Sequence, residues 1–194
     1  MKNIVFFSNN KNKIKEVSNL LQDISYEVLS LNSFEKVESP NESARTFKEN
    51  AKIKSLFGFK KFNKICFADD SGICIKAMNG KPGINSKEFL NSNKNKNDTL
   101  NQIINIAKNK NKFSAYFQTT ICLSINKNDH FFFTGKILGR ISNKIKGVDG
   151  FGYDPIFIPN GYDLTFAEMK MRDKNKISHR SIAISKFKKY LVSI

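Results

Sequence analysis

Two adjacent acidic residues, Asp69 and Asp70, follow a short apolar run in the segment KICFADDSGICIKAMNGKPG, residues 64–83. Neighbouring carboxylates repel each other, so the pair either caps a turn in water or holds a positive charge. We expect a strand to end here, at the kind of sheet edge where α/β proteins bind ligands. Successive residues of a strand point to opposite sides, which predicts different roles for the two acids. An Asx turn over DDSG is the alternative.

A third acid could join this pair from a preceding loop. Glu42 lies before a helix that we expect to begin at the capping-box pattern Thr46–Glu49. Carboxylates without histidines suit Mg²⁺, which binds oxygen ligands and bridges to substrate phosphates. The two histidines, His130 and His179, are far apart in the sequence, so a zinc site is not expected.

Lysines near two predicted helix starts could contact phosphates. The segment SNNKNKIKEV, residues 8–17, predicts the end of a strand and a helix from about Lys11. The free N–H groups at the start of that helix, together with Lys13, favour an anion. Lys54 lies four residues after Asn50, on the same face of the next predicted helix. An ordinary capped helix and a surface lysine are the alternatives.

A glycine-rich loop could bind a base. The segment DGFGYDPIFIP, residues 149–159, places Phe151 and Tyr153 beside glycines. Glycines let a backbone approach a ligand closely, and an aromatic ring there could stack on a base. The segment KNKISHRS, residues 174–181, gathers donors at the start of a final helix that could read the carbonyl oxygens of a base or bind phosphate. The alternatives are a turn with core aromatics and a capped surface helix.

The apolar pattern predicts an α/β fold in a single domain over residues 1–194, with a central twisted mixed β-sheet flanked by helices. Strict alternation predicts a long strand over 113–125 and a partner strand over 130–138. We expect this hairpin to build a second lobe, with the active site in a cleft between the lobes. The remaining elements are predicted as strands over 4–7, 26–31, 65–68 and 73–77, and helices starting near 10, at 46 to about 57, around 100–107 and from 178.

The composition is strongly basic: the 194-residue chain carries a net charge of +16, and 40% of its residues are hydrophobic. Such a charge is typical of nucleic-acid-binding proteins, but the lysines are scattered and no nucleic-acid-binding motif is present. We expect a solvated surface and an anionic substrate, with neither nucleic acid nor a membrane as partner. The short apolar start and three cysteines without CxxC spacing predict a cytoplasmic protein without a secretory signal.

Taken together, the motifs resemble those of the inosine triphosphate pyrophosphatase family, also called Ham1-like. The matching segments occur in family order and span nearly the whole chain: SNNKNKIKEV, TFKENAKIKS, ADDSGICIKAMNGKPGINS, GFGYDPIFIP and TFAEMKMRDKNKISHRSIAISKF. The resemblance implies a hydrolase acting on acid anhydrides, which uses Mg²⁺ to convert ITP, dITP and XTP to the monophosphate and pyrophosphate. It also implies a two-lobed homodimer that cleanses the nucleotide pool.

Carried over residue by residue, the resemblance implies specific roles. Asp70 would be the proton acceptor that activates water, and Glu42 and Asp70 would serve the metal. From its place beside Asp70, we add Asp69 to the predicted metal ligands. The predicted substrate contacts, with Phe151 stacking on the base, are Ser8, Asn9, Asn10, Lys11, Asn12, Lys13, Lys54, Ser71, Phe151, Gly152, Tyr153, Asp154, Lys174, His179 and Arg180.

One segment departs from the family pattern: NSKEF, residues 85–89, follows the PG turn where a serine-alanine-arginine run is usual. Lys87 stands where arginine is usual, and lysine keeps the charge but loses the bidentate fork, which could alter phosphate affinity or product release. A related, Maf-like pyrophosphatase with another base preference is one alternative, and a basic nucleic-acid-binding protein is another. The second alternative predicts strongly salt-dependent binding and does not explain three acids within motifs.

Overall fold

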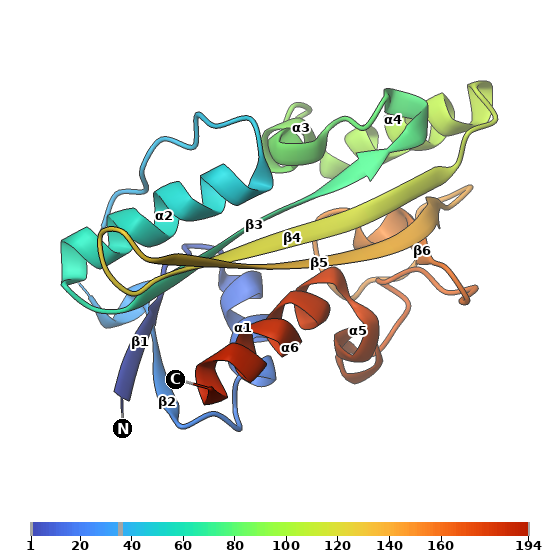
Figure 1. The fold of residues 1–194 in the computed structure, drawn as a ribbon. Helices are drawn as coiled ribbons and strands as arrows, with labels where there is room; N and C mark the ends of the chain where they lie inside the picture. The colour runs from blue at the N-terminus through green and yellow to red at the C-terminus, as the bar shows by residue number, and fades with distance from the viewer. Residues whose placement is uncertain (1, 35–36, 194) are drawn as a thin grey trace. The chain divides into compact units, whose positions relative to one another are not determined.

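The computed structural model describes residues 2–34 and 37–193, and its strands form a six-stranded sheet in the order β2-β1-β3-β4-β5-β6 (Figure 1). Strand β1 pairs in parallel with β2 and β3, whereas β5 and β6 are antiparallel. The sheet is therefore mixed, as predicted. The strands are β1 (Lys2–Phe6), β2 (Tyr26–Ser30), β3 (Cys66–Ile75), β4 (Ser114–Ser124), β5 (His130–Ile141) and β6 (Phe157–Pro159).

Two helices begin at the residues that the capping patterns indicate. Asn10 caps the first helix, and Thr46 caps the second. The second helix runs five residues beyond its predicted end at Phe57, and stops where Asn63 adopts a left-handed conformation with φ 50°. The helices are α1 (Lys11–Leu20), α2 (Phe47–Phe62), α3 (Ser86–Leu90), α4 (Lys96–Asn109), α5 (Met171–Ile177) and α6 (His179–Val192).

The chain divides into two compact units, which agrees with the two-lobed prediction. The first contains the residues up to Asp70, the hairpin tip Thr119–Gly135 and the chain from Arg180 onward; the second contains Ser71–Gln118 and Lys136–His179. The hairpin does not build a lobe of its own, because its tip belongs to the first unit and its base to the second. The predicted cleft between the lobes stays a prediction.

In the first unit, helices cover both faces of the strands (Figure 1). On one face, apolar residues of α1 and α6 pack with Phe6 and Phe67, whose rings stack 4.8 Å apart. On the other face, Val5, Phe7 and Cys66 pack against the aromatic residues of α2. The strand β3 is therefore covered on both sides, and any charged residue within it must find partners from these helices.

The second unit has its own core. Apolar residues of α3 and α4 pack with Ile73 and Ile75 of β3, with Phe117 of β4 and with the segment from Tyr153 to Met169. The strand β6 lies inside this segment, where the sequence predicted only a loop. No helix among residues 2–34 and 37–193 is long and apolar enough to cross a membrane.

Strand β3 is the largest departure from the predicted elements. It runs without interruption from Cys66 to Ile75, whereas the sequence predicted a strand end at Ala68 and a separate strand over 73–77. The prediction of a strand end and the Asx-turn alternative are both wrong. The two acids lie in the middle of a strand.

Helix α2 packs tightly against Cys66 and Phe7 at Gly58. A Cβ at this position would lie 2.4 Å from Sγ of Cys66 and 2.8 Å from the ring of Phe7. Alanine is the better helix former by about 1 kcal/mol, yet we expect Gly58→Ala to lower the free energy of unfolding by about 1–3 kcal/mol through overpacking. Urea denaturation measures this, with the exposed Lys60→Ala as control. Equal stability of G58A and the wild type would contradict it.

Candidate active site

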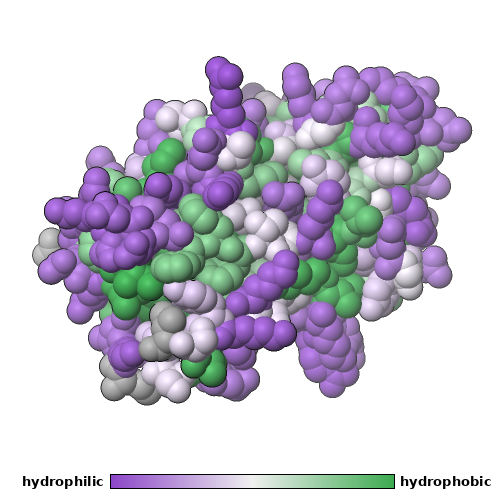
Figure 2. All heavy atoms as spheres, viewed as in Figure 1, coloured by the Kyte–Doolittle hydropathy of each residue, from purple (hydrophilic) through white to green (hydrophobic). Residues whose placement is uncertain are grey.

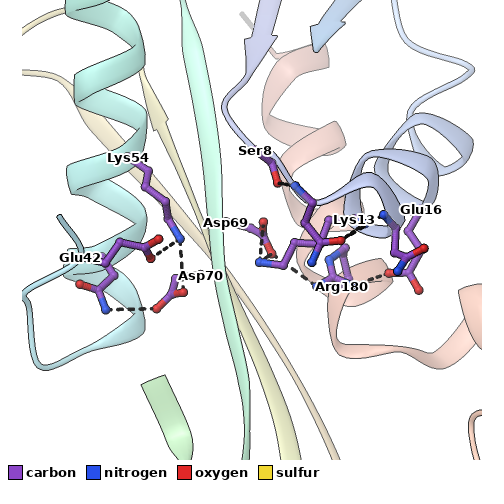
Figure 3. Close-up of polar contacts among 11 residues, drawn as sticks. Ser8, Lys13, Glu16, Glu42, Lys54, Asp69, Asp70 and Arg180 are labelled. Carbon is purple, nitrogen blue, oxygen red and sulfur yellow. Dashed lines mark hydrogen bonds and ion pairs between the residues drawn. The ribbon is translucent and has the colours of Figure 1, made fainter. Parts of the chain in front are cut away.

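Asp69 and Asp70 lie on opposite faces of β3, and each meets its own set of cations (Figure 3). Asp69 faces α1 and α6, and Asp70 faces α2. Both are almost fully buried, with 3% and 7% of their surfaces exposed. The sequence prediction that the two acids have different roles agrees with this alternation.

Asp70 is held by two side chains from one face of α2. Lys54 Nζ lies 3.3 Å from Oδ1, and Asn50 Nδ2 donates to Oδ2 at 3.3 Å. Lys54 also contacts Glu42 Oε2 at 2.5 Å, so its ammonium joins the two carboxylates. Asn50 Oδ1 accepts a hydrogen bond from the Ala44 N–H at 3.1 Å, which ties the loop of Glu42 to the helix.

Burial makes Asp70 a stronger base than an ordinary aspartate. It raises the pKa of the carboxyl, and the carboxylates of Glu42 and Asp69 add to the shift, while Lys54 and Lys13 oppose it without cancelling it. Burial alone would lower the pKa of Lys54, but the three nearby carboxylates outweigh it and raise that pKa. Lys54 is therefore a firmly charged ammonium beside a carboxyl that holds protons more readily than usual.

This shift gives a direct prediction for the metal-free protein. The Asp70 carboxyl should titrate above the ordinary aspartate value of about 3.9. Carbon NMR of aspartate carboxyl groups measures this, with Asp70→Asn assigning the signal. Titration of Asp70 at or below about pH 3.9 would show that its cations dominate over burial.

The residues around Lys54 fit a magnesium site completed by substrate. Glu42 and Asp70 point at one position, the ammonium of Lys54, from two sides. Within the described part of the chain, no three His, Cys, Asp or Glu side chains gather as a metal site. Two carboxylates are the usual protein share of a Mg²⁺ site in which phosphate oxygens and water supply the rest. The predicted pair Glu42 and Asp70 therefore suits Mg²⁺ bound together with a triphosphate.

Asp69 belongs to a separate buried ion-pair network. Lys13 Nζ lies 3.0 Å from its Oδ2, and an Nη of Arg180 lies 3.5 Å from the same oxygen. Arg180 also contacts Glu16 of α1. Although burial acts to raise it, the pKa of Asp69 is held well below its usual range by Lys13, Arg180 and Lys54. Asp69 lies on the opposite face of β3 from Asp70, with its oxygens toward Lys13 and Arg180, and its predicted role as a metal ligand stays a prediction.

The start of α1 presents the predicted phosphate-contacting segment. The Asn10 side chain caps its own helix by accepting from the N–H groups of Asn12 and Lys13, at 3.0 and 3.3 Å. Ser8 Oγ accepts from the Asn10 N–H at 3.3 Å, and Asn9 donates to Ser39 Oγ at 3.0 Å. The residues from Asn9 to Asn12 are exposed. Burial lowers the pKa of Lys13, which Asp69 opposes and Lys54 reinforces.

In the second unit, an aspartate organises the aromatic loop. Asp154 Oδ2 accepts from the Phe151 N–H and from Lys174 Nζ, both at 2.7 Å. The Lys174 ammonium lies 5.0 Å from the centre of the Phe151 ring. Gly150 has φ +74°, and a Cβ there would lie 2.2 Å from Asp154 Oδ2, so this turn requires glycine. Phe151, Asp154 and Lys174 thus come together, and their predicted contact with a base stays a prediction.

Two other predicted base contacts, His179 and Tyr153, contact neighbouring residues of the second unit outside the group of Phe151, Asp154 and Lys174. The His179 ring stacks on Phe117, with ring centres 4.7 Å apart and an interplanar angle of 9°. Tyr153 belongs to the hydrophobic core, and its hydroxyl donates to the Ser86 carbonyl at 2.6 Å. Both the ring and the hydroxyl of Tyr153 therefore make contacts within the core. Ser71 is half-buried and extended in β3.

Sequence reasoning missed Glu16, Ser86 and Phe117. A signal existed for Glu16, which follows Lys13 by three residues and so shares its helix face. For Ser86 the polar contact is made partly by its backbone carbonyl, which no residue type encodes. Phe117 was read only as part of an alternating strand.

Comparisons with known proteins cover almost the entire chain. A model of the Ham1 family matches residues 4–190. A protein of Flavobacterium psychrophilum named dITP/XTP pyrophosphatase is 41% identical over 180 residues, which are 93% of this chain and 94% of the relative. A protein of the same name from Bacillus subtilis is 35% identical over 193 residues, or 98% of both chains.

Solved structures agree with this relationship. A HAM1 protein from Coxiella burnetii superposes with a TM-score of 0.91 at 32% identity, covering 100% of both chains. The Ham1 protein of Staphylococcus aureus gives a TM-score of 0.85 at 34% identity, covering 99% of each. The predicted α/β fold is confirmed by these matches. Since the family model and the relatives extend over nearly the full length, this chain belongs to the Ham1 family.

Proposed function

We propose that this protein hydrolyses ITP, dITP and XTP to the nucleoside monophosphate and pyrophosphate, with Mg²⁺. The observation that carries the proposal is the buried Asp70 carboxyl, with raised pKa, facing Lys54 and Glu42 in a chain of this family. The activity is that of a hydrolase acting on an acid anhydride. Its substrates would be drawn from a cytoplasmic nucleotide pool, and the three free, buried cysteines suit a reducing compartment.

The chemistry requires a water molecule, a proton acceptor and positive charge around the triphosphate. Asp70 would take a proton from the water as the water oxygen bonds to the α-phosphorus. The bond from that phosphorus to the oxygen bridging the α- and β-phosphates would break, and pyrophosphate would leave with the bridging oxygen. Mg²⁺, held by Glu42, Asp70 and phosphate oxygens, would neutralise charge on the phosphates. Lys54 would turn from its carboxylates toward the phosphates, and Lys13 would remain anchored by Asp69.

Base selection would come from the second unit. Lys174 is a donor that could meet the 6-oxo group of hypoxanthine or xanthine, and Phe151 beside it could stack on the ring. Adenine carries an amino group at that position, so a donor would face another donor. Guanine would be rejected if its 2-amino group finds no acceptor in the pocket. Asp154 fixes the direction of the Lys174 ammonium.

The test is hydrolysis of dITP, XTP, dGTP and dATP with Mg²⁺, with the products identified by chromatography. Monophosphate and pyrophosphate from dITP and XTP alone are the expected result. Equal hydrolysis of dGTP would be consistent with the proposed hydrolysis mechanism but would overturn the proposed base selection. Cleavage of modified pyrimidine triphosphates instead would favour the Maf-like alternative. Omission of Mg²⁺ should abolish turnover, and activity without a divalent cation would contradict the metal assignment.

Assembly is a further part of the proposal. We expect a homodimer, and light scattering during size-exclusion chromatography measures it directly. A mass of one chain, 22.2 kDa, at all protein concentrations would contradict this expectation.

The net charge of +16 favours one competing function, nucleic-acid binding. On the face shown in Figure 2, hydrophilic residues cover most of the surface and hydrophobic ones form small groups between them. A scattered charge of this kind binds nucleic acid weakly and without sequence preference. Tight, salt-dependent binding of duplex DNA together with no hydrolysis of any triphosphate would favour this competing function.

A further inference from the structure

Ser86 is a buried junction of three hydrogen bonds in the second unit. Its Oγ donates to the Gly83 carbonyl at 2.5 Å and accepts from the Ile73 N–H at 3.0 Å. Its own carbonyl accepts from the Tyr153 hydroxyl at 2.6 Å. Ser86 and Tyr153 are 5% and 4% exposed, so water cannot replace these bonds easily.

The junction is tight because of Gly72. A Cβ at this position of β3 would lie 2.1 Å from the Gly83 carbonyl oxygen and 2.4 Å from Ser86 Oγ. Only glycine lets the strand approach the segment from Gly83 to Ser86 this closely. The sequence interpretation of Gly72 as a turn residue is thus replaced by a packing role.

The three bonds connect two segments that the proposed function uses. One is β3, in which Ser71 directly follows Asp70 and precedes Gly72. The other is the loop from Phe151 to Asp154, which contains Tyr153 and whose four residues were all predicted to contact the substrate. Burial, followed by the charge of Glu88, raises the pKa of the Tyr153 hydroxyl, so it stays protonated and able to donate at neutral pH.

We propose that Tyr153 and Ser86 are positioning residues that hold the base-binding loop in a fixed relation to β3. This inference rests on the proposed function and adds to it. Neither side chain touches substrate. Tyr153 acts by setting where Phe151 and Asp154 lie, and Ser86 acts by tying that loop to the backbone of Ile73. Loss of either contact would let the loop accept bases of different shape and slow the reaction of the preferred one.

Kinetics of Tyr153→Phe, Ser86→Ala and the double variant test the proposal, with dITP and dGTP as substrates. Tyr153→Phe keeps the ring and removes only the donor, so we expect kcat/KM for dITP to fall about tenfold. The ratio of dITP to dGTP hydrolysis should fall as well. Ser86→Ala should behave similarly, and the double variant should lose less than the product of the single losses. Ser86→Thr, which keeps a hydroxyl, should recover part of the ratio.

The matched control is Tyr116→Phe, which removes a hydroxyl that hydrogen-bonds Cys74 elsewhere in the same unit. Its kinetics and its dITP to dGTP ratio should stay at wild-type values whatever its Tm. Hydrogen exchange provides a readout that needs no activity: in Tyr153→Phe, the peptides covering 83–86 and 151–154 should exchange faster.

The outcomes separate the two proposals. A wild-type protein that hydrolyses no purine triphosphate overturns the proposed function, while exchange still tests the junction. A Tyr153→Phe variant with a lowered Tm but unchanged kcat/KM, base ratio and exchange at both segments overturns the positioning role. A changed base ratio with unchanged Tm supports it most directly.

Discussion

Asp70→Asn should reduce kcat/KM for dITP by about 10²- to 10⁴-fold, the usual contribution of a positioned proton acceptor. An amide in place of the carboxylate cannot take the proton of the attacking water. It also removes one of the two carboxylates expected to hold Mg²⁺, so the apparent Mg²⁺ requirement should rise. Lys54 keeps its contact with Glu42, and asparagine has nearly the same shape, so the folded structure should persist. Steady-state kinetics across a Mg²⁺ series measure both effects.

Asp163→Asn is the matched control for this prediction. The Asp163 side chain is fully exposed and pairs with the half-exposed Arg140, so the same substitution there should leave kcat, KM and Tm unchanged. Thermal unfolding of Asp70→Asn distinguishes a chemical effect from misfolding. If Asp70→Asn retains more than about a tenth of the wild-type activity, Asp70 is not the proton acceptor.

Asp69→Asn should act on stability instead. The substitution leaves Lys13 and Arg180 facing a neutral amide in a site where Asp69 is only 3% exposed. Removing one partner of a buried ion pair costs about 3–5 kcal/mol, because the remaining charge stays desolvated. Urea denaturation at neutral pH measures the loss. A double-mutant cycle of Asp69→Asn with Lys13→Met should show strong coupling, because Lys13→Met removes the buried charge that Asp69→Asn leaves unpaired.

The pH dependence of this loss has a definite sign. Asp69 has a depressed pKa in the folded protein, so its contribution is fully present above the unfolded value of about 3.9 and disappears as the pH falls toward the folded pKa. The difference in unfolding free energy between wild type and Asp69→Asn should be constant from pH 7 to about 5 and shrink below pH 4. A difference that grows on acidification would mean that the folded protein raises this pKa.

Several features were readable from the sequence because they depend on neighbours in the chain. The caps at Asn10 and Thr46 bind N–H groups two or three residues later, so their residue types and spacing sufficed. The long hairpin followed from strict alternation over 113–125. The family resemblance was inferred from motifs, each of which is a stretch of consecutive residues and can be read without the fold.

The tertiary structure alone decided how the two acids are used. The chain continues straight through Asp69 and Asp70 because each carboxylate meets an ammonium from a different helix, so neither needs a turn open to water. The partner Arg180 comes from 111 residues further along the chain, a pairing that no local pattern encodes. Glycine is likewise required at position 72 because the Gly83 backbone carbonyl packs against it. Charge compensation and close approach are properties of three-dimensional neighbours, so only the fold could pair Asp70 with Lys54, and Asp69 with Lys13 and Arg180.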